Sequence, residues 1–350
     1  MIFRTPSYYN AFHCIAGECK DSCCIGWEIE IDEETVESYK AIPGVFGDRL
    51  RSCIGMSDAP CFLTDEQNRC PFLNADNLCD IILQLGEDSL CQICTDHPRY
   101  YSWFGTVKEG GLGLCCEEAA RMILTEPFSL TEREIPDEEC EFPDASLFEC
   151  LTKARAEMFR MLQGDALSEG ICRMLDFAES MQERTDNGCF TLPEEVAELP
   201  SAKGNLPEIL TFLQTLEAIN DGWHQTLHAV WCHFREIDAA REHFAKENPQ
   251  ASEYLRNIAI YFIWRYVLKV AFDEEYLSRV KLSAVSTAVI GCLFIDHWME
   301  HGTLTLTDCA EIAKNYSKEI EYSEENLNAM LDAAYDLSSM TTASLKGLFC

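Results

Sequence analysis

Cysteine is the residue type in this chain most suited to metal binding or redox chemistry. Twelve of the 20 cysteines lie within the first 116 residues. Several are closely spaced, such as Cys19 and Cys23, the adjacent Cys23 and Cys24, and Cys91 and Cys94. Thiolates that return at such intervals can approach one metal from a single turn, while thiolates from later segments complete its coordination. The pattern therefore predicts a metal-binding module, and an all-sulfur donor set suits zinc and an iron–sulfur cluster alike.

The sequence around these cysteines favours metal binding over disulfide bonds. The first ten residues lack the basic stretch and apolar segment of a secretory signal, so we expect a reducing, cytoplasmic location. A disulfide framework needs an oxidising compartment instead. Buried free thiols are the other interpretation, and we expect it for most of the eight later cysteines, such as Cys172 and Cys292.

The charge of the chain excludes one class of partner. Sixty acidic residues against 27 basic ones give a net charge of −33. Binding of a phosphate backbone requires clustered Lys and Arg, so we expect no nucleic acid partner.

No apolar run approaches the roughly 18 residues of a membrane helix, so we expect no membrane segment. The acidic surplus is typical of a solvated surface, and it also suits a lysine-rich protein partner.

The elements expected to position the cysteines change in character along the chain. Residues 27–32 alternate apolar and acidic side chains, which predicts a half-buried strand, and Asp32 should cap a following helix. Residues 131–145 contain two prolines and a run of acids without periodicity, which predicts a linker. Beyond it, Ser146 and Glu149 form a capping box that should open the first of several helices.

Apolar periodicity predicts helices over most of the remaining chain. They are expected near residues 146–162, 168–183, 206–220, 222–244, 251–271, 284–300, 307–320 and 323–338. The fold class is therefore expected to be mainly α. A Cys-rich metal-cluster module with a few short strands at residues 1–130 should precede an all-helical domain at residues 146–350.

The order of the cysteines resembles that of a known family. The segment from Phe12 to Asp32 reads Phe-x-Cys-x4-Cys-x-Asp-x-Cys-Cys-x-Gly-Trp-x-Ile-x-Ile-Asp, and it resembles the opening of the FliB-type flagellin lysine-N-methylases. Later motifs follow in the same order: Cys70-Pro-Phe-Leu, Cys79, Cys94-x2-His-Pro-Arg-Tyr, and Leu114-Cys-Cys-Glu-Glu-Ala-Ala-Arg. The helical remainder is similar mainly around residues 254–268. The Cys-rich part is also similar to YkgJ-like zinc- or iron-chelating domains.

This resemblance implies a protein-lysine N-methyltransferase that moves a methyl group from S-adenosylmethionine to lysines of flagellin and holds a [4Fe-4S] cluster. The thiols that match the family motifs are Cys14, Cys19, Cys23, Cys24, Cys70, Cys79, Cys94 and Cys116. One cluster takes four thiolates, so four remain for a second metal, a redox pair or packing. In an extended segment Cys23 and Cys24 should point apart, so at most one of them should bind a given iron.

Methyl transfer constrains the remainder of the site. The acceptor amine must be neutral and in line with the sulfonium methyl, which favours a narrow channel that desolvates the ammonium. His97 and Tyr100 are the candidate catalytic residues. Arg99 is a candidate clamp for the donor carboxylate, and Trp27 is a second candidate for donor binding.

Two common methyltransferase patterns are incomplete in this sequence. The radical pattern Cys-x3-Cys-x2-Cys fails because residue 26 is glycine, so we expect polar displacement. The Gly-rich loop between a strand and a helix has one candidate, residues 109–113, which we interpret as a turn between strands. The alternative function is a non-catalytic zinc/iron-binding or redox module that binds a partner protein.

Overall fold

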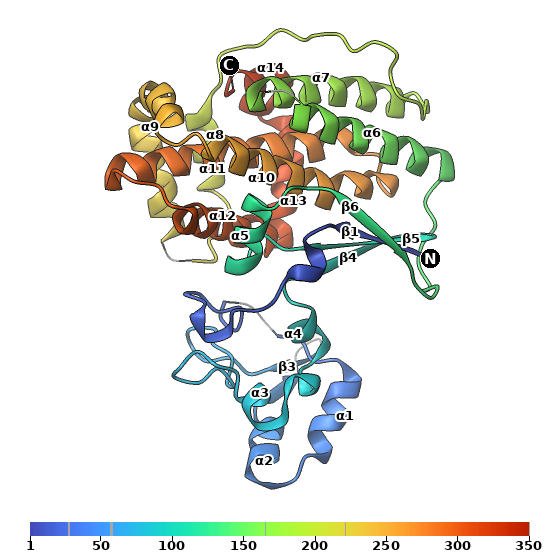
Figure 1. Ribbon diagram of the computed structural model, residues 1–350, viewed down its shortest axis with the longest axis vertical. Coiled ribbons are helices and arrows are strands. Elements are labelled where there is room, and N and C mark those ends of the chain that lie inside the picture. The colour runs from blue at the N-terminus through green and yellow to red at the C-terminus, as the bar shows by residue number, and fades with distance from the viewer. Residues whose placement is uncertain (27–28, 57–58, 165, 221, 350) are drawn as a thin grey trace.

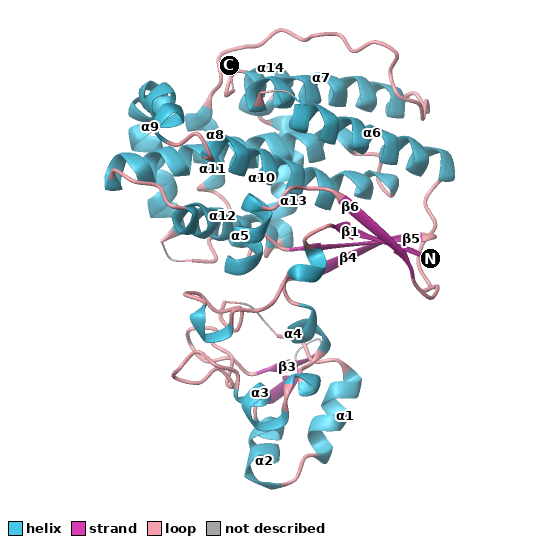
Figure 2. Ribbon diagram, viewed as in Figure 1, coloured by secondary structure: helices cyan, strands magenta, loops and turns pink. Residues whose placement is uncertain are grey.

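The computed structural model of the protein describes residues 1–26, 29–56, 59–164, 166–220 and 222–349. It shows two lobes of unequal size (Figure 1). We call residues 13–97 the small lobe, and residues 1–12 with 98–349 the large lobe. The chain begins in the large lobe, crosses to build the small lobe, and then returns (Figure 1). Helices dominate the large lobe, whereas loops make up much of the small one (Figure 2).

The small lobe consists of short elements. They are α1 (Glu33–Ala41), α2 (Gly44–Ser52), β2 (Ile54–Met56), β3 (Pro60–Phe62), α3 (Asp80–Leu85) and α4 (Gln92–Asp96), with 3-10 turns at Ala16–Glu18 and Glu87–Ser89. The predicted cap of α1 is confirmed, because the Asp32 carboxylate accepts the Thr35 N–H at 2.9 Å. The strand predicted over 27–32 lies partly outside the described residues, and within them Glu30 forms a single β-bridge with Cys61.

A four-stranded sheet forms one face of the large lobe. Its strands are β1 (Ile2–Pro6), β4 (Arg99–Phe104), β5 (Val107–Leu112) and β6 (Leu130–Glu134), in the order β4-β5-β1-β6. Strand β1 pairs parallel with β5 and antiparallel with β6. The linker predicted over residues 131–145 was wrong at its start, because β6 occupies residues 130–134. All five β6 residues are exposed, so the strand is held by backbone pairing with β1. Its sequence therefore lacks the apolar pattern that would predict a strand.

The helices of the large lobe pack on one another and on this sheet. They are α5 (Glu117–Thr125), α6 (Ala145–Gly164), α7 (Leu167–Asp186), α8 (Leu206–Leu213), α9 (Trp223–Glu247), α10 (Ala251–Tyr266), α11 (Tyr276–His301), α12 (Leu306–Glu321), α13 (Glu324–Asp336) and α14 (Thr342–Lys346), with 3-10 segments at Tyr9–Ala11, Val267–Ala271 and Ser338–Met340. The predicted mainly α fold class is confirmed.

The starts of α6 and α11 depend on residues that the sequence prediction did not use. The capping box at Ser146 and Glu149 was wrong, because α6 begins one residue earlier and the Asp144 carboxylate accepts the Leu147 N–H at 2.8 Å. Helix α11 begins eight residues before the predicted start at residue 284. There the Gln182 side chain of α7 accepts the N–H groups of Tyr276 and Leu277 at 2.7 and 2.9 Å. A cap supplied by another helix leaves no local sequence signal.

Helix α11 forms the centre of the large lobe. Among the described residues it is the one helix long and apolar enough to cross a membrane, and 94% of its most apolar window is buried within the protein. It packs against α10, α7 and α9. Its apolar character is therefore used in the core of the lobe.

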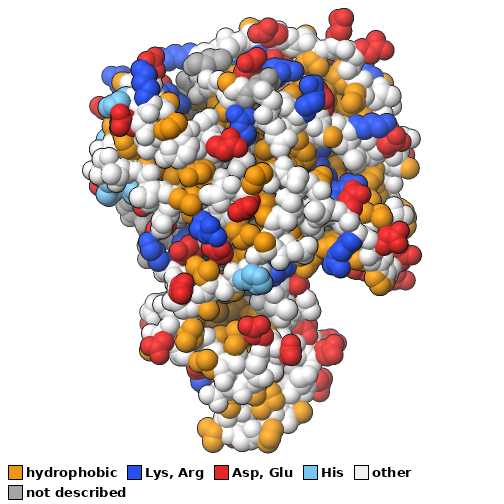
Figure 3. All heavy atoms as spheres, viewed as in Figure 1, with side chains coloured by type: hydrophobic (Ala, Val, Ile, Leu, Met, Phe, Trp, Pro, Cys, Tyr) orange, Lys and Arg blue, Asp and Glu red, His pale blue; other side chains and the backbone are white. Residues whose placement is uncertain are grey.

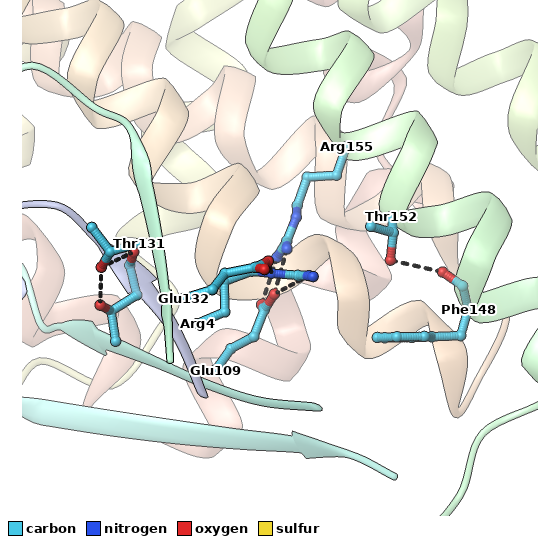
Figure 4. Close-up of polar contacts among 8 residues, drawn as sticks. Arg4, Glu109, Thr131, Glu132, Phe148, Thr152 and Arg155 are labelled. Atoms are coloured by element: carbon cyan, nitrogen blue, oxygen red, sulfur yellow. Dashed lines mark hydrogen bonds and ion pairs between the residues drawn. The ribbon is translucent and has the colours of Figure 1, made fainter. Parts of the chain in front are cut away.

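A buried ion pair joins the sheet to the helices (Figure 4). The Arg155 guanidinium of α6 donates to both oxygens of Glu109 on β5, at 2.7 and 2.5 Å. The same guanidinium lies 4.3 Å from the centroid of the Trp264 ring, and Arg4 donates to Glu109 at 3.3 Å. The Arg155 and Glu109 side chains are 2% and 5% exposed. The contact has two parallel hydrogen bonds and is shielded from water. It is therefore a fixed joint between the sheet and the helices.

Each lobe has a hydrophobic core of its own. The core of the large lobe includes residues from β1, β4 and β5 together with the helices that follow. The core of the small lobe is separate and contains Ile29, Tyr39, Phe62 and Phe72 among others. The division between the cores therefore falls near residues 13 and 97, and it does not coincide with the module boundary predicted between residues 130 and 146.

Candidate functional site

A cleft of about 980 Å³ lies between the lobes, and Figure 3 shows the waist at which they meet. Its walls come from the small lobe, from β4 and from the end of α12. The lining residues are Glu30, Ile31, Asp32, Glu33, Met56, Ala59, Pro60, Gln92, Ile93, Asp96, His97, Arg99, Tyr100, Tyr101, Trp103, Glu321 and Tyr322. Five of them are acidic, and Arg99 is the one Lys or Arg among them. A cationic group is therefore favoured in this cleft.

The aromatic wall of the cleft is built on β4. Tyr101 and Trp103 lie two residues apart on this strand, so their side chains share one face of the sheet. The Lys108 ammonium, which binds Glu138 at 2.8 Å, lies 4.8 Å from the centroid of each ring. These rings therefore already accommodate one ammonium, as aromatic faces do through their negative quadrupoles.

A chain of hydrogen bonds leads from the sheet into the cleft. The Tyr9 hydroxyl donates to the Tyr101 hydroxyl at 3.1 Å, and Tyr101 donates to Asp96 Oδ1 at 3.3 Å. The other Asp96 oxygen accepts from Gln92 at 2.7 Å. Asp96 is therefore a carboxylate with a fixed orientation at the end of α4. Sequence analysis missed it, although it is the residue immediately before the predicted His97.

The structure brings together three of the four candidate catalytic and donor-binding residues. His97, Arg99 and Tyr100 all line the cleft. Burial, with a contribution from the Lys318 charge, lowers the pKa of His97 to about 4, so its imidazole is neutral at pH 7. The Arg99 guanidinium packs 5.1 Å from the centroid of the Phe12 ring. The fourth candidate, Trp27, lies outside the described residues.

Tyr100 has an unusual environment. Its hydroxyl is buried and has no hydrogen-bond partner among the described residues, while the Arg265 guanidinium lies 4.3 Å from the centroid of its ring. Burial raises the pKa of Tyr100 well above its ordinary value. The phenol therefore stays protonated at neutral pH, and it can donate a hydrogen bond but is a poor base.

Glycines in β5 and just after it make room for this arrangement. A Cβ atom at Gly111 would lie 2.3 Å from the Tyr100 hydroxyl oxygen, and one at Gly113 would lie 2.9 Å from Cys115 Sγ. Residues 109–112 belong to β5, so the turn predicted over residues 109–113 was wrong. The turn lies earlier, where Gly105 has a φ of 62°. These glycines permit close packing of side chains across a strand.

A buried polar network supports the cleft from the large lobe. Glu321 accepts hydrogen bonds from Tyr261 at 2.9 Å and from Tyr266 at 2.7 Å, and it pairs with Arg265 at 3.3 Å. The Glu321 side chain is 1% exposed. Sequence analysis missed this network because its members belong to α10 and α12. The available signal was Arg265, the one charged residue in the stretch 258–266 of α10.

Six cysteines of the described residues lie in or against the small-lobe core: Cys24, Cys53, Cys70, Cys79, Cys91 and Cys94. Backbone contacts hold their segments together, since Cys70 N–H donates to the Cys24 carbonyl at 2.8 Å and Cys79 forms a β-bridge with Leu73. Burial raises the pKa of Cys70 to about 12, and the charges of Cys24, Cys79 and Cys91 act in the same direction. Because these charges act on Cys70, the thiols of Cys24, Cys79 and Cys91 lie close to it.

The other matched cysteines, Cys14, Cys19, Cys23 and Cys116, lie at the junction of the lobes. Cys19 Sγ is 3.5 Å from a Glu117 oxygen that also accepts the Lys20 N–H at 2.8 Å. Glu117 opens α5, and Cys116 is the residue before it. The pKa of Cys23 is raised by its hydrogen bond to Cys24, by burial, and by the charges of Cys24, Cys14 and Cys116. The two adjacent thiols therefore contact each other, and the expectation that they point apart was wrong.

Two lysines of α12 hold the loop that carries these thiols. The Asp21 carboxylate accepts from Lys314 at 3.0 Å and from Lys318 at 2.5 Å. Both lysine side chains are at most 10% exposed. The loop between Cys19 and Cys23 is therefore fixed to the large lobe by a charge triad.

The donor chemistry of these cysteines bears on the kind of metal group. A zinc ion needs its ligands about 2.3 Å from one point. No three His, Cys, Asp or Glu side chains come together in that way within the described residues. In a [4Fe-4S] cluster each thiolate binds a different iron, so the sulfur ligands lie further apart. The matched donors are all thiols, which both zinc and an iron–sulfur cluster accept.

Comparison with known proteins adds a family to this geometry. Residues 165–348, more than half of the chain, match the model of the FliB lysine N-methylase C-terminal domain. Proteins named lysine-N-methylase from Salmonella typhimurium and Salmonella choleraesuis are each 30% identical over 143 residues, which cover 37% of this chain and 35% of the relative. The flagellar biosynthetic protein FliU of Salmonella muenchen is 30% identical over 133 residues, covering 35% of this chain and 76% of that protein.

The extent of these matches is limited. The chain spans about a third of the length of the two lysine-N-methylases that it matches. No solved structure matches it.

Proposed function

Since this chain belongs to the FliB lysine N-methylase family, we propose that it transfers methyl groups to lysine side chains of a protein. S-adenosylmethionine is the proposed donor and flagellin the proposed acceptor. The flagellar name of one relative supports the choice of acceptor. A [4Fe-4S] cluster is the proposed metal group, because the order of the cysteine motifs resembles that of the family and thiolates are the ligands of such a cluster.

The observation that carries this proposal is the cleft. It has the two properties that a lysine acceptor requires, an acidic lining that attracts the ammonium and an aromatic wall that can surround it. The position of Lys108 against Tyr101 and Trp103 shows how an ammonium is held by these rings. Burial of the amine between the lobes would then lower its pKa and favour the neutral nucleophile.

Proton removal is best assigned to Asp96. Tyr100 stays protonated and its hydroxyl is buried, so it is not assigned the proton. His97 is neutral at pH 7, and burial together with the Lys318 charge opposes its protonation. Asp96 is a carboxylate held in place by Tyr101 and Gln92, and it can take the ammonium proton while the acceptor approaches.

The remaining candidates hold the other groups. Arg99 lines the cleft, and its guanidinium can clamp the carboxylate of the donor. The cluster, when bound by the matched thiols, would fasten the loops beside the cleft and supply an iron–sulfur surface there. The side chains of Asp96 and Arg99 would act on the acceptor and the donor directly.

The test is a methylation assay on anaerobically purified protein with flagellin and S-adenosylmethionine, followed by mass spectrometry of the flagellin. We expect a mass gain in methyl steps. Asp96→Asn should lower the rate by about 100-fold or more, as loss of a general base does. Asp88→Asn is the matched control, because Asp88 is exposed in the same lobe and does not line the cleft.

The outcome also separates the two functional classes. A protein that carries iron and sulfide but leaves flagellin unmodified would support the alternative of a non-catalytic metal or redox module. Equal rates for Asp96→Asn and Asp88→Asn would contradict the role of Asp96 as the base.

A further inference from the structure

Strand β4 forms one edge of the four-stranded sheet, and its outer side has no strand partner among the described residues. It lies on the side of the sheet nearer the small lobe (Figure 1). Five of its six residues are partly exposed, and Phe104 alone is buried. An open edge presents backbone N–H and C=O groups that can pair with another extended chain.

The pairing of β4 with β5 determines which backbone groups face outward. The Gly113 N–H donates to the Pro98 carbonyl at 2.7 Å, so these two residues form a hydrogen-bonded pair of the antiparallel ladder. Hydrogen-bonded and non-hydrogen-bonded pairs alternate along such a ladder. Residues 100, 102 and 104 are therefore bonded to β5, and the N–H and C=O groups of Arg99, Tyr101 and Trp103 point away from the sheet.

The cleft follows this open edge. Arg99, Tyr101 and Trp103, whose backbone groups point outward, all line it. A chain that paired with β4 would therefore lie along the cleft and could place a side chain beside the rings of Tyr101 and Trp103. The acidic lining favours a cationic side chain at that place.

A second cavity, of about 400 Å³, continues along the same edge. Four consecutive residues of β4, 101–104, line it, and two of them, Tyr101 and Trp103, also line the cleft. Consecutive side chains of a strand point to opposite faces of the sheet, so a cavity that touches all four residues lies along the edge. The cleft and the second cavity are therefore two parts of one groove along β4.

The charge of the second cavity is opposite to that of the cleft. Its charged lining residues are Lys269, Arg279 and Asp273, and Asp273 pairs with Arg279. The Lys269 ammonium lies 5.2 Å from the centroid of the Tyr266 ring and forms no ion pair with a described residue. The Arg279 Nε is buried and has no hydrogen-bond partner among the described residues. Two cations against one carboxylate favour an anionic group here.

The ionisation of Lys269 agrees with this preference. Burial and the charges of Arg265 and Arg279 lower the pKa of Lys269 to about 8, although Glu321 and Asp273 oppose the shift. A carboxylate bound in the second cavity would offset the repulsion between these cations.

We propose that an extended segment of the acceptor protein binds as an added strand along the edge of β4, with its lysine in the cleft and an acidic side chain in the second cavity. The inference deepens the proposed function, and it rests on that function only for the role of the lysine as methyl acceptor. Backbone pairing supplies affinity without regard to sequence, and the two oppositely charged cavities select the side chains.

The two faces of the sheet determine the spacing of these side chains. Tyr101 and Trp103 point to one face, and Phe104 points to the other, where its ring stacks on Phe272 of the second cavity at 5.7 Å. An added strand follows the same alternation. Its lysine and its acidic residue should therefore be adjacent in sequence or three positions apart.

The first experiment measures the binding of synthetic peptides to the wild-type protein by calorimetry, without a methyl donor. The probe has about eight residues, alternating threonine and valine, with a central lysine followed by glutamate. Two further peptides carry N-methyl groups on alternate amides, one in each of the two possible phases. Only one phase faces β4, so we expect one N-methylated peptide to bind about 30-fold more weakly and the other to bind within about twofold of the probe.

A second experiment tests the charge of the second cavity. Lys269→Gln should weaken binding of the glutamate peptide by about tenfold, whereas a peptide with glutamine in place of glutamate should bind the variant and the wild type alike. Lys246→Gln is the matched control, because Lys246 is exposed on α9. If Lys269→Gln does not fold, the weaker binding of the glutamine peptide to the wild type makes the same test.

Three results would overturn the proposal. They are equal binding of the two N-methylated peptides, no binding of the probe, and equal binding of the glutamate and glutamine peptides to the wild type. Dimerisation of the protein in place of peptide binding would assign the edge to a second copy of the chain and would also overturn it.

Binding and methyl transfer are separate readouts. Phase-dependent binding of the peptides without methylation of flagellin would contradict the proposed function and leave this inference intact. Methylation of flagellin by a protein that binds both N-methylated peptides equally would do the reverse.

Discussion

The two lobes reach a folded state by different means. The large lobe has helices of up to 26 residues around the buried α11, and the fixed joint between Arg155 and Glu109 connects its layers. The core of the small lobe contains ten buried residues, two of which are cysteines, and its helices have at most nine residues. Helices of that length are marginal without tertiary support, and a core of that size supplies little. The comparison indicates that apolar packing stabilises the large lobe, and we propose that metal binding stabilises the small one.

Removal of the metal should break the small lobe alone. Structural metal sites contribute on the order of 10 kcal/mol to folding, which exceeds what this core can supply. After chelation under oxidising conditions, limited proteolysis should cut within residues 13–97 and leave α6–α14 protected. Protein reconstituted with iron and sulfide is the control. Digestion of both lobes at the same rate would contradict the comparison.

Loss of the buried ion pair should affect the large lobe. Glu109→Ala leaves the buried Arg155 guanidinium without its partner, and we expect a loss of about 3–5 kcal/mol in the free energy of unfolding. The control is Glu132→Ala, because Glu132 binds Arg4 at 2.6 Å but is 52% exposed. That change should cost less than about 1 kcal/mol. Urea unfolding followed by circular dichroism measures both, and equal losses would rule out the joint.

The charge triad links the two lobes, so its loss should show in both. Asp21→Asn leaves the Lys314 and Lys318 ammoniums next to each other without a carboxylate. We expect a loss of about 2–3 kcal/mol, because the lysines are buried and Asp21 is partly solvated. The control is Asp76→Asn, at an exposed position of the small lobe. Thermal unfolding measures the stability of both variants. If Asp21→Asn is as stable as the control, the triad does not stabilise the protein.

Acid should produce the smallest effect, through His97. Its pKa falls from 6.5 to about 4 on folding, so the unfolded state binds the proton more readily between these values. Stability should therefore fall as the pH drops below about 6.5, by about 1 kcal/mol at pH 5 after allowance for partial solvation. Wild type and His97→Gln are compared by urea unfolding at pH 7 and pH 5. Wild type should lose more stability than the variant, and identical losses would exclude His97 as the cause.

Sequence patterns predicted the helices of the large lobe because apolar periodicity is a local property. They failed where the determinant is remote in sequence, as at α11, whose start depends on Gln182 of α7. They also failed for β6, which is held by backbone pairing and exposes every side chain.

The site divides in the same way. His97, Arg99 and Tyr100 belong to one short motif, and all three line the cleft. Glu321 belongs to α12, more than 200 residues away, so only the folded chain brings it to the same cleft. Cysteine spacing indicated metal binding, but the division of eight thiols between two places depends on how the 14–24 loop crosses between the lobes.

The parallel pairing of β1 with β5 bears on the order of folding. Ile2 pairs with Val107, so about 100 residues must be closed into a loop before this register can form. Arg99 Nη2 lies 3.5 Å from the Phe12 carbonyl, so the two ends of the small lobe are adjacent. If the small lobe folds first, it holds the two ends of this long loop together. The strands β1 and β5 can then pair with less loss of chain entropy. Metal loading of the small lobe should then accelerate the folding of a sheet that binds no metal itself.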